Sequence, residues 1–279
     1  MRVLALTVVA LICFAANSVL TRAALVGGDT GPGVFTALRL LSGALALGGL
    51  AALSGRLRAL EPRRVTVSGL WLFLYAAAFS YAYVSLDSGV GALLLFGAVQ
   101  VTMFAGALAG GERISLARWL GAASAMTGLA ALTAPGATAP PLVAAGLMAV
   151  SGVAWGVYSL RGRSAADAMA TTGAAFLVAA PLGLALWLGF GAGEPVSMRG
   201  AALALASGAL ASGGGYAVWY AVLPKLDATL AAIAMLTVPL IAFAGGVVFL
   251  AEPATLRFAL ASVLILGGLA AATLVGGRR

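Results

Sequence analysis

The sequence predicts an all-α polytopic membrane protein with ten transmembrane helices, arranged as two inverted-topology five-helix repeats. Three observations lead to this prediction: an apolar composition, ten apolar runs of membrane-spanning length, and a stretch that recurs half a chain later. Hydrophobic residues make up 62% of the 279 residues and charged residues 9%, against roughly 25% charged in a soluble domain. So little charge cannot cover the surface of a water-soluble fold.

Ten runs are long enough to cross a hydrocarbon core of about 30 Å, which takes about 20 helical residues. Gly, Pro, Asp and Arg punctuate the short joints between them. The first run continues to Val26, which favours a membrane span over a signal peptide. The expected spans are 3–26, 33–53, 66–85, 89–109, 115–133, 141–160, 168–190, 198–223, 228–250 and 256–275.

Residues 86–112 recur at 226–252, an offset of 140 residues. In an ungapped comparison extended to Ala131 and Ala271, 11 of 46 paired positions are identical. Five spans per copy is an odd number, so the second copy must enter the membrane in the opposite sense. The expected units are residues 1–134 and 135–279, forming one membrane domain around a central cavity, a plan typical of secondary transporters.

The distribution of basic residues predicts the orientation. Twelve of the 16 Lys and Arg residues fall on the side of the N-terminus and three on the other side, while Arg39 lies inside a span. Cytoplasmic loops carry such an excess of positive charge. Both termini are therefore expected in the cytoplasm, and the net charge of +8 reflects membrane orientation better than nucleic-acid binding.

The residue types also narrow the chemistry. The chain has no His and a single cysteine, Cys13, inside an apolar run. No disulfide framework is possible, and neither a metal nor another cofactor is expected. A membrane-embedded lipid enzyme would need a nucleophile, an acid–base pair or metal ligands converging at one depth, and that set is missing. We therefore expect no enzymatic activity.

The duplicated five-span unit, the Gly111–Glu112 and Glu252–Pro253 joints, Pro239 and Arg39 together resemble the drug/metabolite transporter superfamily. Within it the chain is most similar to the ten-helix EamA-type proteins, and among these to YddG-type bacterial amino acid exporters. The resemblance implies a bacterial inner-membrane protein that exports small metabolites through a cavity between its halves. One departure is that Pro239 has Val99 as its counterpart.

Within the third span, aromatic residues recur at every fourth position, which places their rings on one helix face. Others lie within the sixth and eighth spans. These rings could line a cavity that holds an apolar substrate group. An interfacial belt or ordinary packing is the alternative, favoured for Trp71 and Tyr83 near span ends. The candidates for substrate contact are Tyr75, Phe79, Trp155, Tyr158, Tyr216 and Trp219.

Polar side chains within the spans are few. Asn17 and Gln100 should face the bundle interior because an amide needs partners away from lipid. Interhelical hydrogen bonding alone would explain that placement, so substrate contact and structural bonding both stay open. Ser80, Ser151 and Ser159 are further candidates.

Arg39 lies about two turns into the second span. It could meet a substrate carboxylate, snorkel to the outer interface, or bond helix-end carbonyls. Because the resembling family shares this residue irrespective of substrate, a structural or gating role is favoured.

All eight acidic residues fall in joints between spans. A proton relay inside a membrane usually shows intramembrane carboxylates or histidines. We therefore expect transport without an obligatory buried proton carrier, driven by the substrate or coupled through groups at helix ends. A run of glycines at 213–215, with Pro224 and Pro239, is a candidate hinge.

The favoured function is alternating-access export of small amphiphilic metabolites, with aromatic or neutral amino acids first. A multidrug, nucleotide-derived or lipid-linked substrate is the alternative within transport. The expected partners are a small-molecule substrate and the lipid bilayer, without nucleic acid, and a monomer is compatible with this function.

Overall fold

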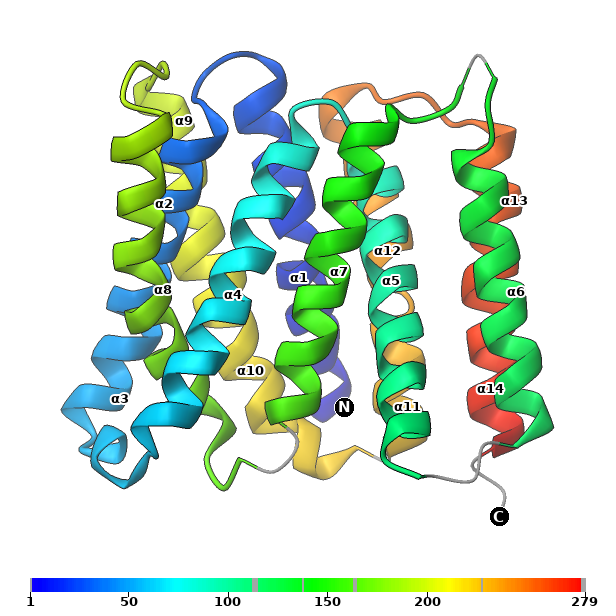
Figure 1. Ribbon diagram of the computed structural model, residues 1–279, viewed down its shortest axis with the longest axis horizontal. Coiled ribbons are helices and arrows are strands. Elements are labelled where there is room, and N and C mark those ends of the chain that lie inside the picture. Colours follow the sequence, from blue (N-terminus) through cyan, green and yellow to red (C-terminus); the bar gives the residue numbers. More distant parts are fainter. Residues whose placement is uncertain (1, 112–114, 137, 163–164, 227, 277–279) are drawn as a thin grey trace.

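The computed structural model describes residues 2–111, 115–136, 138–162, 165–226 and 228–276, and its regular elements in these ranges are all helical. Nine helical segments in these ranges are long and apolar enough to cross a membrane. A further helix, α6, lies alongside them (Figure 1). The all-α polytopic fold is thereby confirmed.

Six spans are single helices. They are α1 (Arg2–Val26), α4 (Pro62–Tyr83), α5 (Ser88–Ala109), α6 (Leu116–Thr133), α7 (Leu142–Gly162) and α8 (Ala168–Phe190). The predicted boundaries differ from these by at most four residues. The largest difference is at α4, where Pro62 occupies the first turn, a position that suits proline because its missing N–H would have no partner there.

Within the described ranges, three spans contain a π-helical segment. The second is α2 (Pro32–Gly43), η1 (Ala44–Gly48) and α3 (Gly49–Leu53); the eighth is α9 (Met198–Ala206), η3 (Ser207–Gly214) and α10 (Gly215–Val222); the tenth is α13 (Leu256–Ser262), η5 (Val263–Gly267) and α14 (Gly268–Gly276). Short 3₁₀ turns, η2 (Arg56–Ala59) and η4 (Leu223–Lys225), lie in the joints that follow α3 and α10.

The ninth span, expected as one run over 228–250, is broken just before Pro239, one of the residues that the sequence predicts as a hinge. α11 (Ala228–Met235) ends two residues before α12 (Val238–Leu250), and Pro239 sits in the first turn of α12. Proline cannot donate to the preceding turn, so the helix restarts there. The matched α5 has Val99 at this position and is continuous, which makes the fourth and ninth spans structurally unequal.

The packing pairs segments that occupy equivalent places in the two copies. The matched spans contact each other: α2 packs against α8, α5 against α12 and α6 against α14. The remaining spans form two equivalent pairs, because α4 of the first copy packs against α7 of the second, and α1 of the first copy packs against α9, η3 and α10 of the second. Ser124 Oγ donates to the Leu264 carbonyl over 2.6 Å, and these positions are 140 residues apart, the offset of the repeat. Close helix contacts therefore follow the internal symmetry.

The start of α1 and the end of α14 lie on the same side of the bundle (Figure 1), called here the face of the termini. The joints after α1, α4, α6, α8 and α12 lie on the other side, called here the face opposite the termini. Four helices begin with a side chain that caps a backbone N–H: Ser115, Asp167, Ser197 and Thr255. These caps explain why the helices start where polar residues interrupt the apolar runs.

Candidate functional site

A small cavity lies within the bundle. Its walls are Phe14, Asn17, Ser18, Arg39, Leu40, Leu72, Tyr75, Ala76, Phe79, Leu95, Phe96, Trp155, Phe176, Ser212 and Tyr216. The residues come from both predicted halves of the chain. The open space is about 20 Å³, room for about one or two water molecules. The cavity is thus contracted, and an organic solute requires the helices to move apart.

Seven of the fifteen residues of the cavity wall are aromatic. Tyr75 lies 5.4 Å from Phe79 and 5.5 Å from Trp155, centroid to centroid, and Phe96 meets Trp155 edge-on at 5.4 Å. Tyr216 and Phe14 on α1 also belong to the wall, and their rings meet in an edge-to-face arrangement at 5.4 Å. Such edges and faces suit a flat apolar group.

Arg39 is the charged residue among the walls. It is only 2% exposed, and its guanidinium lies 5.2 Å from the Tyr75 ring centroid and 4.7 Å from that of Phe79. Nη2 donates to the Tyr75 hydroxyl over 2.9 Å, whereas Nη1 has no hydrogen-bond partner among the described residues. Arg39 therefore neither snorkels to an interface nor bonds helix-end carbonyls, two of the alternatives that its position in the sequence allowed.

Asn17 supplies the amide at the cavity. Its Oδ1 accepts hydrogen bonds from Ser207 over 2.8 Å and from Ser212 over 3.2 Å. Both serines belong to η3, which also contains two of the three glycines predicted as a hinge. Asn17 consequently has the interhelical bonds expected of it and also lines the cavity.

Other candidates from the sequence lie away from the walls. Tyr158 is buried and donates to Thr172 over 2.8 Å, while Trp219 packs edge-on against Phe14 from outside the cavity. Gln100 and Ser159 are partly exposed and make no side-chain hydrogen bond with the described residues. Substrate contact by these four stays a prediction that this contracted conformation does not support.

Several walls escaped the sequence interpretation. Phe14, Phe96 and Phe176 are ordinary members of apolar runs, and Ser18 and Ser212 are small polar residues without a distinctive pattern. The sequence signal that could have found some of them is a position on the same helix face as Asn17 or Tyr216. That position becomes informative only when the neighbours of each helix are known.

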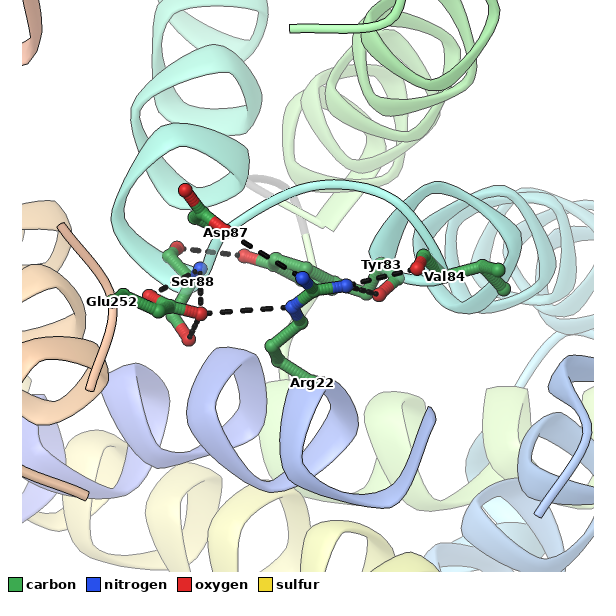
Figure 2. Close-up of polar contacts among 6 residues, drawn as sticks. All are labelled: Arg22, Tyr83, Val84, Asp87, Ser88 and Glu252. Atoms are coloured by element: carbon green, nitrogen blue, oxygen red, sulfur yellow. Dashed lines mark hydrogen bonds and ion pairs between the residues drawn. The ribbon is translucent and has the colours of Figure 1, made fainter. Parts of the chain in front are cut away.

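A second polar cluster, the Glu252 latch, lies on the face opposite the termini (Figure 2). Its members are Arg22, Tyr83, Asp87, Ser88 and Glu252. The Glu252 carboxylate accepts from Ser88 N over 2.9 and 2.8 Å and from Ser88 Oγ over 3.0 Å. It therefore caps α5 from across the predicted halves, at the helix end where a negative charge is favourable.

Arg22 completes the latch from α1. It lies 3.7 Å from Glu252 Oε1 and 3.5 Å from Asp87 Oδ1, and it donates to the carbonyls of Tyr83 and Val84 (Figure 2). The guanidinium on α1 thus connects the joint between α4 and α5 to the joint that follows α12. The repeat counterpart of Glu252, Glu112, lies outside the described residues.

The environment of Glu252 shifts the pKa of its carboxyl. Burial raises the pKa of this carboxyl, the hydrogen bonds from Ser88 lower it, Asp87 raises it and Arg22 lowers it, with a net result above the ordinary value. The desolvation of a carboxylate outweighs its favourable contacts here. Glu252 therefore takes up a proton more readily in this arrangement than it would in water.

Further contacts tie the two predicted halves on the same face. Glu194 accepts from the backbone N–H groups of Gly33 and Val34 over 3.1 and 2.8 Å and so caps α2. Asp29 pairs with Arg199 at 2.6 Å. In the described residues, no group of three or more His, Cys, Asp and Glu side chains is placed to hold a metal ion.

These features define a class of protein: a polytopic helical membrane protein with a contracted solute cavity between two similar halves, closed on one face by polar contacts. Comparison with known proteins gives the family. Residues 142–274 match the EamA-like transporter family. The chain is 49% identical over 274 residues to the uncharacterized protein PA1977 of Pseudomonas aeruginosa, covering 96% of this chain and 93% of that protein.

A solved crystal structure shares the fold with a TM-score of 0.68 at 23% identity, over 97% of each chain. This chain belongs to the EamA-like transporter family. The resemblance drawn from the sequence is confirmed at the level of the family, and the chain is a membrane transporter.

Proposed function

We propose that this transporter exports small amphiphilic metabolites by alternating access, with aromatic or neutral amino acids as the favoured substrates, as in YddG-type exporters. The observation that carries the proposal is the contracted cavity, whose aromatic walls come from segments of both predicted halves. A site at the interface of two repeats can be exposed to either side by rocking one against the other.

The proposed unit is one membrane domain of two halves, residues 1–134 and 135–279. We place it in a bacterial inner membrane with both termini in the cytoplasm, on the basis of the Lys and Arg distribution. Its proposed partners are the substrate and the lipid bilayer, without nucleic acid, and it is proposed to work as a monomer without enzymatic activity.

Among the described residues, the polar contacts between the proposed halves differ on the two faces. The face opposite the termini has the Glu252 latch, in which the side chains of Arg22 and Glu252 are 12% and 7% exposed, and the partly buried Glu194 cap. On the face of the termini, Arg56 and Asp167 pair at 3.6 Å with side chains 54% and 36% exposed. Exposed pairs contribute little. This asymmetry fits a state closed on the outer face under the proposed orientation.

Counterflow in liposomes tests the proposal directly. Purified protein is loaded with an unlabelled amino acid, and uptake of radiolabelled phenylalanine, leucine and unrelated amphiphiles is followed. We expect phenylalanine and leucine to exchange. Flux of the unrelated amphiphiles alone contradicts the proposed substrate.

Trp155→Ala then tests whether the cavity is the path. Removing this wall should weaken phenylalanine exchange about tenfold while affecting leucine less, because an aromatic contact contributes beyond its buried area. Trp119→Ala is the matched control, since Trp119 is 50% exposed and packs on Phe104 outside the cavity. Equal losses for both substrates, or equal losses in both variants, would contradict a substrate-facing role.

A further inference from the structure

Arg39 is a buried cation whose hydrogen bonding is incomplete. An arginine side chain keeps its charge under all ordinary conditions and carries five N–H donors. One donor goes to the Tyr75 hydroxyl, two ring faces lie against the guanidinium, and Nη1 has no partner among the described residues. A charge so far from water normally has an anion beside it.

The described protein does not supply that anion. No carboxylate of the described residues pairs with Arg39, and none of the side chains around the cavity is acidic. Two arginines on the face opposite the termini, Arg22 and Arg199, each have at least one carboxylate partner. Arg39 therefore differs from them in having a donor without a partner among the described residues, on a side chain that lines the cavity.

We propose that Arg39 is the anion-binding residue of the transport site and that the site selects a carboxylate attached to an apolar or aromatic group. This inference rests on the proposed function and narrows its substrate class. The α-amino group is dispensable, because the cavity walls offer no acidic partner for an ammonium and Asn17 Oδ1 already accepts two hydroxyl groups. Apolar monocarboxylates without an amino group are then substrates too.

The surroundings of Arg39 suit this role. Tyr75 and Phe79 hold the guanidinium by one hydrogen bond and two ring contacts, which fix its plane without neutralising it. The rings of Phe96 and Trp155 belong to the same cavity and are available to the apolar group. Once the cavity has expanded, one substrate molecule could place its carboxylate on Nη1 and its ring against Trp155.

Binding to the full-length protein in detergent at neutral pH tests the proposal. Four probes share a phenyl group: phenylalanine, phenylalaninamide, phenylpropionate and phenethylamine. We expect the two carboxylates to bind, and the amide and the amine to bind at least about tenfold more weakly, as for the loss of a charge-assisted hydrogen bond. Phenylpropionate should compete with phenylalanine for one site.

Variants connect this ranking to one side chain. Arg39→Gln should weaken phenylpropionate by about tenfold or more and abolish the preference for phenylalanine over its amide. Arg39→Lys keeps the charge but not the planar donors and should retain part of the affinity. Arg199→Gln removes a charge from an exposed ion pair outside the cavity and should leave the ranking unchanged.

Three results would overturn the anion site: an amide that binds as tightly as phenylalanine, carboxylate binding that survives Arg39→Gln, or no carboxylate binding at all. If Arg39→Gln does not fold, the wild-type ranking and Arg39→Lys still decide. Phenylalanine flux in liposomes is measured separately. If phenylalanine and its amide are transported equally well, the anion site is refuted and the proposed export function stands. If the carboxylates bind but phenylalanine is not transported, the proposed function is refuted and the anion site stands.

Discussion

The Glu252 latch should resist opening of the face opposite the termini, and Glu252→Ala should release it. The carboxylate holds the Ser88 N–H at 2.8 Å and the Ser88 hydroxyl at 3.0 Å. In Glu252→Ala the fully buried Ser88 loses the acceptor of both its N–H and its hydroxyl, and each buried donor left without a partner costs about 1–3 kcal/mol. Arg22 keeps Asp87 and two carbonyls as partners, so its loss is partial. Glu252→Ala should therefore weaken the closed state by about 2–4 kcal/mol.

A cysteine in the cavity reports the opening. Ser18 lines the cavity and is 3% exposed, so Ser18→Cys in a Cys13→Ser background is shielded while the latch is closed. A membrane-impermeant thiol reagent is added on the latch side. Since about 1.4 kcal/mol corresponds to a tenfold change in population, Glu252→Ala should accelerate labelling about 30-fold or more.

Arg199→Gln provides the control on the same face. Its pair with Asp29 joins a side chain 67% exposed to one 20% exposed, and such pairs contribute about 0–1 kcal/mol. Labelling should change by no more than about fivefold. A Glu252→Ala rate within this range of the wild-type rate would refute the assignment of Glu252 as a latch.

Three further predictions use the same protein. The pKa of Glu252 is raised in the closed state, and it should return to its ordinary value when the face opens and water reaches the carboxyl. The closed state then binds the proton more tightly, so lowering the pH through the raised pKa should favour closure. Cysteine labelling should slow in acid, and in Glu252→Gln it should no longer depend on pH. Gly208→Ala places a methyl group against the Arg39 carbonyl and should destabilise the protein by about 1–3 kcal/mol in a detergent denaturation assay, whereas Gly214→Ala, which has open space, should cost less than about 1 kcal/mol. Tyr75→Phe removes the hydrogen bond from Arg39 Nη2 to the Tyr75 hydroxyl and should lower the stability by about 1–3 kcal/mol in that assay. An unchanged midpoint would show that the ring contacts alone hold the guanidinium.

The spans could be predicted because their length and apolar content are properties of single segments. The 168–190 prediction coincides with α8, and Pro239 marks the break of the ninth span through the chemistry of one residue. Family membership followed from the repeat and the joint residues. The π-helical segments carry no comparable local signal, and none was predicted.

Membership of the cavity depends on helix rotation and depth. Trp155 lines the cavity, while Tyr158, three residues later on α7, turns to Thr172. The apolar character of both rings is the same, so the sequence could not separate them. The latch was equally hidden, because Glu252 finds Ser88 164 residues away in the chain.

The π-helical segment η3 has a geometric consequence for the cavity. Successive α-helical residues turn by about 100°, so Ser207 and Ser212 would point about 140° apart in an α-helix. A π-helix, with hydrogen bonds between residues five apart, brings both hydroxyls to Asn17. If η3 tightened to α-helical winding, one hydroxyl would leave Asn17 and the Tyr216 ring on α10 would turn about the helix axis. One change of winding would thus rearrange a polar contact and an aromatic wall together.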